Sequence, residues 1–396
     1  MNILITTIFN YPHEGGLSSH ITTLKKGLEK EGHLVDVLSF SDLPNWKRKL
    51  FAQGPGYVMN RIKHGKGQLH NDLQRKSLLS NIILEKAPSY DVINSQDIFA
   101  TLASLECGLP VVATVHGYYA YEAISRGAIH PNTDEAEKIK RFEQQAYNGV
   151  QLNVTVDKRI CGYVKETSGV EAQIIRNFID TEQFNHYSRP ELTRSKYHLP
   201  QDAFMLFVPR RLTEKNGVVY PLLALKQIHD LYPNVILVYA GTGEQLSALK
   251  KKTEEFNLQN YVYFLGSVPH QDMVELYQTS QIVLIPSVHS HGVEEATSIS
   301  AIEAMGSGTP VIAGSIGGLK ELITHDVDGL LFGDRDEKML SDFIRYLVEN
   351  PEIGKTLAKR AKQKVISNFS HITAAKKFEG LYSQAIQKRA STSLKE

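Results

Sequence analysis

The sequence predicts an α/β protein built from two doubly wound, Rossmann-like domains. The chain has 396 residues, and because a usual domain holds roughly 100–200 residues, two domains of near-equal size are expected. Short apolar runs alternate with amphipathic, helix-like stretches, which is the pattern of βαβ units and of a mostly parallel sheet. This alternation weakens near residue 181 and starts again near residue 203, so each half is expected to fold around its own sheet.

The first predicted domain, residues 1–180, contains five strand-like runs. They occupy residues 2–9, 34–40, 91–96, 110–116 and 152–157. Residues 20–33 lie between the first two runs and have the apolar spacing of an amphipathic helix that ends near Gly32. Because strands and helices follow one another in series, we expect these strands to be parallel.

The second predicted domain, residues 203–372, repeats this organisation. Its strand-like runs occupy residues 203–210, 234–241, 262–266, 281–287 and 310–314. Residues 181–202 are polar, contain Pro190 and Pro200, and are predicted to link the two domains. The C-terminal part, residues 373–396, is expected to form a helix over 373–389 and then a disordered polar tail.

The composition excludes several classes of partner. The formal net charge is +1, and neither a zinc-finger spacing nor a long basic tail is present, so a nucleic-acid partner is not expected. Cys107 and Cys161 allow a single disulfide, but a reduced, cytosolic pair is the favoured interpretation. No apolar run approaches the roughly 20 residues of a membrane span, and the N-terminal run does not resemble a signal peptide. We expect a cytoplasmic protein that is soluble or lies on the inner face of a membrane.

The segment over residues 45–70 differs from the rest of the chain. It interleaves the cations Lys47, Arg48, Lys49, Arg61, Lys63 and Lys66 with the apolar residues Trp46, Phe51, Tyr57 and Met59. One interpretation is a surface for an anionic acceptor or for anionic lipid headgroups. The other is a solvated loop and helix, which the lack of a clean apolar stripe favours.

Two features of the first half are candidates for ligand binding, because ligands of open parallel sheets bind at the carboxyl ends of the strands. Gly15 and Gly16 follow the first strand and precede a helix expected to begin near residue 17 or 18, where backbone N–H groups can meet a phosphate. His116 ends the run at 110–116 and either binds a sugar hydroxyl or is satisfied by its neighbours at the strand end.

The second half carries a stronger signal in its first turn. Arg210, Arg211 and Lys215 lie close together directly after a strand, where they repel one another unless an anion is present. A diphosphate suits them, since an Arg can bind two of its oxygens and Lys adds a compact charge. The alternative is a solvated basic turn. Further glycine turns at 240–244 and 265–269, the second containing Gly266 and Val268, also follow strands.

Two acids surround the next helix start. Glu295 lies in the predicted loop, Thr297 or Ser298 is a suitable N-cap, and a helix from Ile299 would contain Glu303. Carboxylates at both ends and free N–H groups between them suit a nucleotide sugar, with one acid on the hexose, the other on the ribose and the N–H groups on a phosphate.

Two other classes of site would also use these acids. Paired carboxylates are the machinery of glycoside hydrolases, but the basic turn and glycine loops would then have no role. A metal site would use the cluster formed by His289, His291, Glu294 and Glu295, which has no supporting second cluster.

Taken in order, these motifs resemble the retaining GT-B glycosyltransferases, the large group called glycosyltransferase family 4. The resemblance covers nearly the whole chain. It comprises GGLSSH at 15–20, TVHG at 114–117, IIRNFIDTEQF at 174–184, PRRLTEKNG at 209–217, AGTGE at 240–244, LGSVP at 265–269, the E-x7-E pair with AMGSGTPVIA at 304–313, and GGLKELI with DGLLF at 317–332. It implies two Rossmann-like domains that face each other across a cleft, with the acceptor mainly in the first and the nucleotide sugar in the second.

The resemblance also implies roles for single residues. Arg211 and Lys215 match the residues that hold the diphosphate, Glu295 matches the acid on the donor hexose, and Glu303 matches the acid on the ribose. His116 matches a histidine near the reaction centre. The remaining donor contacts would come from Gly15 and Gly16 at the diphosphate, Gly266 and Val268 at the base, and the backbone of Thr297, Ser298 and Ile299. No metal and no cofactor are expected, because Arg and Lys replace the divalent ion.

This sequence departs from the family pattern at three places. Arg176 and Phe178 replace the usual proline and glycine beside Asn177. Arg210 stands where the family usually has Gly, so it stays open which of Arg210 and Arg211 holds the diphosphate. Glu295 is followed by Ala-Thr-Ser where the family usually has Gly-Phe-Gly, which indicates an unusual sugar or a smaller pocket.

The function predicted from the sequence is retaining, metal-independent transfer of a hexosyl unit from a nucleoside diphosphate sugar, expected to be a UDP-sugar, to an acceptor hydroxyl. The acceptor would be a glycan, a glycolipid or a small molecule, including lipid-linked and polysaccharide acceptors. A sugar-nucleotide epimerase and a non-catalytic nucleotide-sugar-binding protein are the alternatives. An NAD-dependent dehydrogenase is disfavoured, because NYPHEGG at 10–16 lacks the G-x-G-x-x-G pattern.

Overall fold

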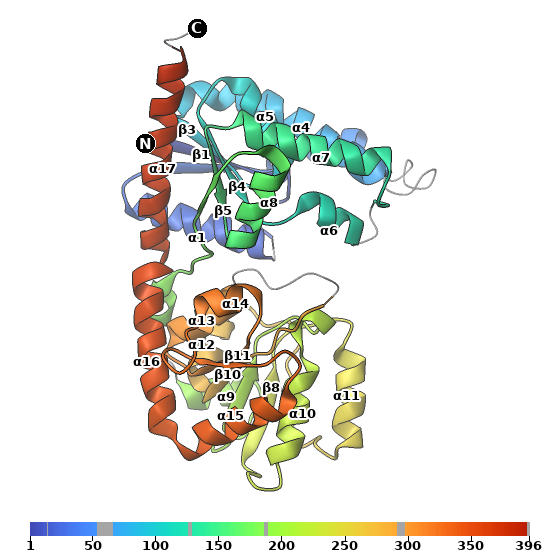
Figure 1. Ribbon diagram of the computed structural model, residues 1–396, viewed down its shortest axis with the longest axis vertical. Helices are drawn as coiled ribbons and strands as arrows, with labels where there is room; N and C mark the ends of the chain where they lie inside the picture. Colours follow the sequence, from blue (N-terminus) through green and yellow to red (C-terminus); the bar gives the residue numbers. More distant parts are fainter. Residues whose placement is uncertain (14, 54–65, 126–128, 186–188, 291–297, 394–396) are drawn as a thin grey trace. The chain divides into compact units, whose positions relative to one another are not determined.

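The computed structural model describes residues 1–13, 15–53, 66–125, 129–185, 189–290 and 298–393. The chain divides into two compact units, each with its own sheet (Figure 1). The first unit comprises Met1–Arg176 and His371–Glu396, and the second comprises Asn177–Ser370.

The first unit contains a six-stranded parallel sheet in the order β2-β1-β3-β4-β5-β6. Its strands are β1 (Asn2–Thr6), β2 (Leu34–Leu38), β3 (Val92–Ser95), β4 (Val111–Val115), β5 (Leu152–Thr155) and β6 (Ala172–Ile174). Every residue of β3 and β4 is buried, as expected for strands covered by helices on both faces. The strand order reverses between β1 and β3, and in such sheets a ligand crevice forms outside the carboxyl ends of the strands at that point.

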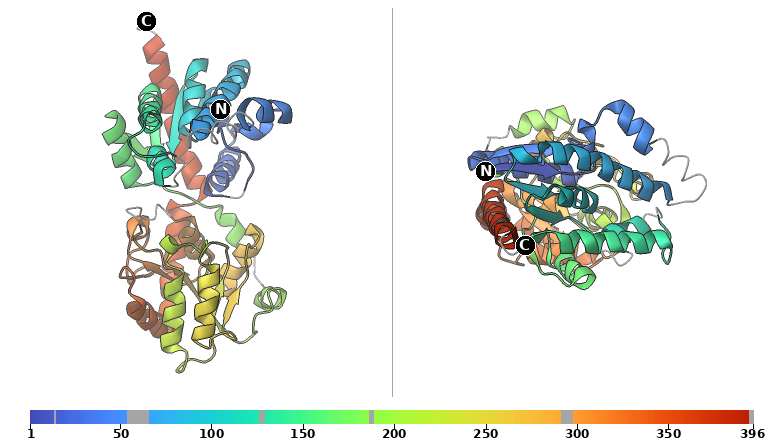
Figure 2. Two further views of the ribbon diagram at one scale, coloured as in Figure 1. Left: turned by 90° about the vertical axis from the view of Figure 1, so that its right-hand side faces the viewer. Right: turned by 90° about the horizontal axis from the view of Figure 1, so that it is seen from above.

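Helices surround this sheet. They are α1 (Gly16–Lys30), α2 (Asn45–Lys47), α4 (Lys66–Lys86), α5 (Ile98–Ser104), α6 (Tyr119–Ser125), α7 (Asp134–Gly149), α8 (Lys158–Ser168) and α17 (His371–Ser393), with short helical turns η1 (Phe40–Asp42), η2 (Arg48–Gln53), η3 (Ala87–Ser89) and η4 (Leu105–Cys107). The C-terminal helix α17 lies against α1 (Figure 2). A Cβ atom at Gly27 of α1 would lie 2.4 Å from the His371 carbonyl oxygen, so only glycine permits this close packing.

The second unit repeats the architecture with the strand order β12-β11-β10-β7-β8-β9, all parallel. Its strands are β7 (Phe204–Val208), β8 (Val235–Tyr239), β9 (Val262–Phe264), β10 (Ile282–Ile285), β11 (Val311–Gly314) and β12 (Leu330–Phe332). Its helices are α9 (Pro190–Lys196), α10 (Val219–Ile228), α11 (Leu246–Glu255), α12 (His270–Thr279), α13 (Ile299–Ser307), α14 (Gly317–Leu322), α15 (Glu337–Glu349) and α16 (Pro351–Asn368), with turns η5 (Thr181–Asn185) and η6 (Glu214–Asn216). Here the order reverses between β7 and β10.

The structure corrects the predicted organisation at both ends of the second unit. The chain passes from the first unit to the second between residues 176 and 177, and residues 181–202, predicted as a linker, fold within the second unit as η5 and α9. The cause is packing of α9 on α12, where Lys196 lies 2.7 Å from Asp272. The chain returns to the first unit at His371, and α17 continues to Ser393, although the tail was predicted to be disordered from residue 390.

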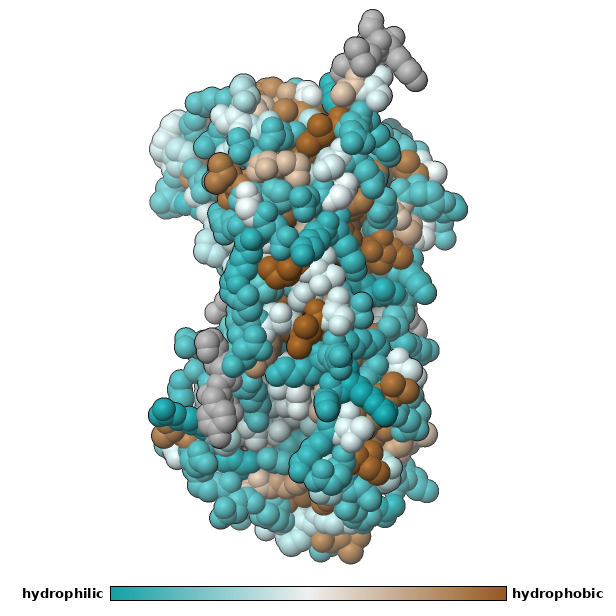
Figure 3. Space-filling model, turned by 90° about the vertical axis from the view of Figure 1, so that its left-hand side faces the viewer, coloured by the Kyte–Doolittle hydropathy of each residue, from teal (hydrophilic) through white to brown (hydrophobic). Residues whose placement is uncertain are grey.

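No helix among the described residues is both long enough and apolar enough to span a membrane. The face turned toward the viewer in Figure 3 is mainly hydrophilic, with hydrophobic residues in small separate patches.

Candidate active site

The Arg210 side chain is buried in the second unit, beside the point where the strand order reverses. It follows β7, is 9% exposed, and its guanidinium donates to Ser298 Oγ (3.0 Å), Asn216 Oδ1 (2.6 Å) and Ser287 Oγ (3.0 Å). These three partners come from the start of α13, from η6 and from the loop after β10. Arg210 therefore ties together the segments that follow the two strands at the reversal of the sheet.

The other two cations of the basic turn are exposed. Arg211 and Lys215 both have exposed side chains, while their backbones are fixed. The Arg211 carbonyl accepts from Asn216 Nδ2 (2.7 Å), and the Lys215 carbonyl accepts from the backbone N–H of Val288 (3.0 Å). The backbone that carries these two cations is thus fixed, and only their side chains remain to be ordered when an anion binds. The structure thus distinguishes the two arginines, which looked equivalent in the sequence. Arg210 is buried and hydrogen-bonded, whereas Arg211 is exposed.

Two glycines allow the loops of this crevice to approach one another. Gly217 has a φ of 60°, and a Cβ there would lie 1.9 Å from the Pro286 carbonyl oxygen. A Cβ at Gly241, after β8, would lie 2.2 Å from the Arg210 carbonyl oxygen. Any side chain at these positions would push the basic turn away from the neighbouring strand ends.

Helix α13 begins as predicted. Ser298 is its N-cap, and its Oγ accepts from the backbone N–H of Ala301 (3.4 Å) as well as from Arg210. Ile299 is the first helical residue. Glu295 and Thr297 lie outside the described residues, as do His291 and Glu294 of the alternative metal cluster.

Glu303 lies in the second turn of α13 with a buried carboxylate. Tyr277 of α12 donates to its Oε2 (2.9 Å), and His270 Nδ1 lies 3.8 Å from its Oε1. Burial raises the pKa of Glu303, and the charges and donors nearby, those of His270 and Tyr277, act in the opposite direction. A buried carboxylate on a helix wall, with lone pairs still available, can accept bonds from neighbouring hydroxyl groups.

The loops after β8 and β9 are joined to each other. The Gly241 N–H donates to the Gly266 carbonyl (2.7 Å), and Gly266 has a φ of 70°. Val268 is half-buried and packs against the core cluster that contains Tyr277. The turn that carries Gly266 and Val268 therefore has a fixed backbone beside the start of α12.

In the first unit, His116 lies at the end of β4 in a defined hydrogen-bond chain. Its Nε2 lies 2.9 Å from Gln96 Oε1, and Gln96 in turn donates to Asn94. Asn94 Nδ2 donates to the Val112 carbonyl (3.0 Å), an acceptor that cannot reverse its role. Burial lowers the pKa of His116 to about 4, so the ring is neutral near pH 7.

His116 also lines a cavity of about 400 Å³ at the carboxyl ends of β3 and β4. Asp97 forms part of this cavity and N-caps α5, while its other oxygen accepts from the Ile8 N–H and the Thr7 hydroxyl (both 2.9 Å). Burial raises the pKa of Asp97 to about 6. On another wall, the Tyr119 hydroxyl donates to the buried Asp72. The cavity thus combines aromatic surface with carboxyl, amide and imidazole groups.

The structure places Gly15 and Gly16 as predicted, at the start of α1. Gly15 is the N-cap with a φ of 145°, and its carbonyl accepts from the Ser19 N–H (3.1 Å). The helix begins at Gly16, slightly earlier than predicted. His20, the last residue of the GGLSSH motif, had been assigned no role of its own. His20 is buried and packs edge-to-face on His116, with ring centroids 4.6 Å apart.

Sequence reasoning also missed the residues that support the predicted ones. Gln96, Asp97, His20, Tyr277 and His270 belong to this group. A polar pair directly after a buried strand, as in Gln96–Asp97, is the signal that could have identified the first two. The other three contact site residues only through tertiary packing.

Two family models match the chain. The model described as Glycosyltransferase Family 4 matches residues 14–183, and the model described as Glycosyl transferases group 1 matches residues 190–364. The first match falls almost entirely on the first unit, and the second falls within the second unit.

Named relatives and solved structures agree with these matches. An uncharacterized glycosyltransferase of Methanocaldococcus jannaschii is 28% identical over 414 residues, with 98% of this chain and 99% of the relative covered. A glycogen synthase of Mycobacterium tuberculosis is 27% identical, with 95% and 92% covered. Anabaena HepE, solved in complex with UDP, superposes with a TM-score of 0.71 at 21% identity, with 97% of this chain and 100% of that chain covered. With both halves matched by their family models, this chain belongs to the GT-B glycosyltransferases of family 4 and is an enzyme of glycosyl transfer.

Proposed function

We propose that this protein transfers a hexosyl unit from a nucleoside diphosphate sugar to an acceptor hydroxyl, with retention of anomeric configuration and without a metal ion. The observation that carries the proposal is the pair of exposed cations, Arg211 and Lys215, on a turn braced by Arg210 at the reversal of the second sheet. Glu303, on the helix whose N-cap Arg210 holds, supplies a carboxylate for the ribose. We expect UDP as the nucleotide, because Anabaena HepE was solved with UDP and with UDP-glucose.

In the proposed reaction, the bond between the anomeric carbon and the diphosphate oxygen breaks, and the acceptor oxygen forms a bond to the same face of that carbon. The departing diphosphate carries the developing negative charge and takes the acceptor proton. Arg211 and Lys215 stabilise this charge more strongly in the transition state than in the bound donor, which is the source of the acceleration. His116, neutral at physiological pH, offers a hydrogen-bond acceptor to a sugar hydroxyl. Glu295 is expected to contact the hexose.

The two rival functions give different results in one assay. A sugar-nucleotide epimerase would convert the nucleotide sugar in the absence of any acceptor. A non-catalytic binding protein would bind the nucleotide sugar without releasing the nucleoside diphosphate from it. The relatives named as glycosyltransferases support transfer to an acceptor.

Thermal stability in the presence of nucleotides tests the donor site. We expect one diphosphate among UDP, GDP, ADP and dTDP, each measured in EDTA, to stabilise the protein selectively. At a concentration of about 100 times the dissociation constant, the added stability should be roughly 2.7 kcal/mol. Stabilisation that requires added Mg²⁺ or Mn²⁺ would contradict the metal-free proposal, and no shift with any of the four would contradict the nucleotide-sugar donor.

We also propose that the first unit docks on an anionic membrane surface. Trp46, Leu50 and Phe51 are 59%, 61% and 43% exposed on consecutive helical turns, α2 and η2. Lys47 lies 5.6 Å above the Trp46 ring, and Lys49 is exposed beside Leu50. Exposed aromatic and aliphatic side chains between cations suit the interface of a membrane with anionic headgroups. This is consistent with an enzyme that works at the inner face of the cytoplasmic membrane on a lipid-linked acceptor.

Sedimentation with vesicles tests this docking. Wild-type protein should bind vesicles that contain phosphatidylglycerol and bind weakly to phosphatidylcholine alone, and Trp46→Ser should lower the bound fraction about fivefold. Leu231→Ser removes a side chain that is 69% exposed in the second unit, so it controls for a general loss of surface hydrophobicity. Equal binding to both kinds of vesicle would contradict the role of the cations.

A further inference from the structure

His270 is the first residue of α12, and it contacts two side chains from different elements. Its Nε2 lies 3.0 Å from Gln183 Oε1, an oxygen that only accepts, so this nitrogen carries the proton. Its Nδ1 faces Glu303 Oε1 at 3.8 Å. His270 is 56% exposed, whereas the Glu303 side chain is 10% exposed. A solvent-accessible imidazole is therefore the neighbour of a buried carboxylate.

The two oxygens of Glu303 have different partners. Tyr277 donates a hydrogen bond to Oε2 and leaves Oε1 to His270. In a neutral His270 ring whose Nε2 bonds Gln183, the Nδ1 lone pair faces the carboxylate, so two acceptors oppose each other. A proton on either of these two atoms, His270 Nδ1 or Glu303 Oε1, removes the repulsion between them. If it resides on His270, Glu303 stays ionised; if it resides on Glu303, the carboxylate is lost.

We propose that His270 is a positioning residue of the donor site, which takes up the proton that Glu303 would otherwise bind and so preserves an ionised carboxylate for the ribose hydroxyls. This inference rests on the proposed function, in which Glu303 receives the ribose. Protonated His270 lies close enough for a strong attraction to a carboxylate of low solvent exposure. Glu303 then accepts two hydroxyl donors, which a protonated acid does less well.

The other charged groups on α12 and α9 lie apart from Glu303. Asp272 contacts Lys196 (2.7 Å) and Tyr197 (2.7 Å), Glu275 accepts from Thr193 (3.5 Å), and Arg194 donates to the Pro200 carbonyl (2.6 Å). Glu191 of α9 is exposed. Strand β7 carries no titratable side chain. The Arg210 charge also acts on Tyr277, whose pKa it lowers against the larger effect of burial. His270 is thus the imidazole that directly faces the Glu303 carboxylate.

The direction of the pH effect follows from these contacts. Burial raises the pKa of Glu303, and the His270 charge lowers it again. Donor binding is complete where Glu303 is ionised and is lost as the pH falls through the Glu303 pKa. Without the His270 charge that pKa is higher, so binding should fail at a higher pH. With a permanent cation at position 270, binding should persist to a lower pH.

Dissociation constants measured by calorimetry between pH 5 and 8 test the proposal. The probe is UDP, or whichever of GDP, ADP and dTDP gives the selective thermal shift. The ratio of the His270→Gln constant to the wild-type constant should be near one at pH 8 and at least about threefold at pH 5.5. For His270→Lys the ratio should stay near or below one at pH 5.5. Titration of the nucleotide's own phosphate cancels in these ratios.

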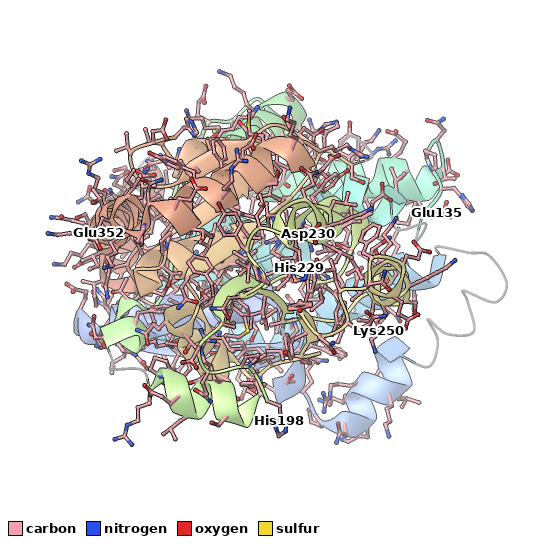
Figure 4. All side chains as sticks on the ribbon, turned by 90° about the horizontal axis from the view of Figure 1, so that it is seen from below. Glu135, His198, His229, Asp230, Lys250 and Glu352 are labelled. Carbon is pink, nitrogen blue, oxygen red and sulfur yellow. The ribbon has the colours of Figure 1, made fainter. Side chains whose placement is uncertain are left out.

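Two further variants serve as controls. Glu303→Gln should bind UDP weakly at every pH, with no difference between backgrounds that have or lack His270. His229→Gln should behave as wild type. His229, labelled in Figure 4, follows α10 and lies near the amino ends of the strands, whereas the proposed donor site lies at their carboxyl ends.

The outcomes separate this inference from the proposed function. Wild-type protein that binds a diphosphate, together with a pH-independent ratio for His270→Gln, overturns the role of His270 and leaves the donor site intact. Wild-type protein that binds none of the four diphosphates at any pH overturns the proposed function, and the inference falls with it. A His270→Lys variant that loses affinity at the same pH as His270→Gln would show that packing, not charge, matters at this position.

Discussion

Replacing Lys215 with alanine is expected to lower kcat by about 10²–10³-fold, because it removes one of the two exposed cations that we propose stabilise the departing diphosphate. Arg211→Ala should have an effect of similar size. The turn that carries both residues is held by backbone contacts and by Arg210, so the variants should fold normally. Steady-state rates of nucleotide release from the donor sugar, measured with an acceptor, give kcat directly.

Lys250→Ala is the matched control for this experiment. Lys250 is an exposed lysine on α11 of the same unit (Figure 4), and its removal changes the net charge by the same amount. Its kcat should equal that of wild type. If Lys250→Ala and Lys215→Ala lowered kcat equally, the effect would be one of overall charge on substrate encounter, and the local stabilisation of the leaving group would be refuted.

Arg210→Ala should behave differently from its neighbour. Its guanidinium is buried and binds Ser298, Asn216 and Ser287, so its removal leaves buried acceptors without their donors. We expect a lower melting temperature as well as lower activity, whereas Arg211→Ala should retain the wild-type melting temperature. The sequence could not distinguish these roles, because two adjacent arginines look equivalent until the direction of each side chain is known.

The sheets were largely predictable because their strands are buried on both faces. A parallel strand covered by helices is a continuous apolar run, and β4, β8 and β10 stand out in the sequence for this reason. The strands β6 and β12 are three residues long and were not among the predicted runs. Such short edge strands are defined by pairing with β5 and β11, which is a tertiary property.

The unit boundaries were predicted less well, for a related reason. Prolines and polar residues suggested a linker at 181–202, yet Pro190 is the first residue of α9, where a proline is well tolerated. The return of α17 to the first unit depends on its packing against α1 at Gly27, a contact between residues more than 340 positions apart in the sequence. No local pattern encodes such a contact.

The candidate site was predictable where its residues follow strands or begin helices, as for His116, Gly15 and Ser298. It was not predictable where the function depends on contacts between side chains of different helices and strands. His20 on His116 and His270 beside Glu303 are examples, since each joins residues from separate elements. The acid and hydroxyl groups over 291–297, including Glu295 and Thr297, remain predictions from the sequence.

Replacing His116 with alanine is expected to reduce kcat/KM at least about a hundredfold while the thermal shift with UDP is retained. The reason lies in the hydrogen-bond chain that determines which nitrogen of His116 carries the proton. The Val112 carbonyl accepts from Asn94, Asn94 accepts from Gln96, and the Gln96 oxygen therefore accepts from His116 Nε2. The neutral ring then presents Nδ1 as an acceptor, which is suited to a sugar hydroxyl and not to the nucleotide.

The pH profile distinguishes this role from a purely structural one. Because the pKa of His116 is lowered to about 4, the ring stays neutral above pH 5.5, and protonation of His116 should cause no loss of kcat/KM between pH 5.5 and 8. Gln96→Glu places a carboxylate at the same nitrogen, which stabilises the imidazolium and raises the pKa of His116. The protonated ring has no acceptor at Nδ1, so this variant should lose activity progressively as the pH falls toward 5.5. Gln96→Glu also removes the amide that donates to Asn94, but that loss does not depend on pH in this range. A Gln96→Glu profile identical in shape to that of wild type would refute the assignment of Nδ1 as the functional acceptor.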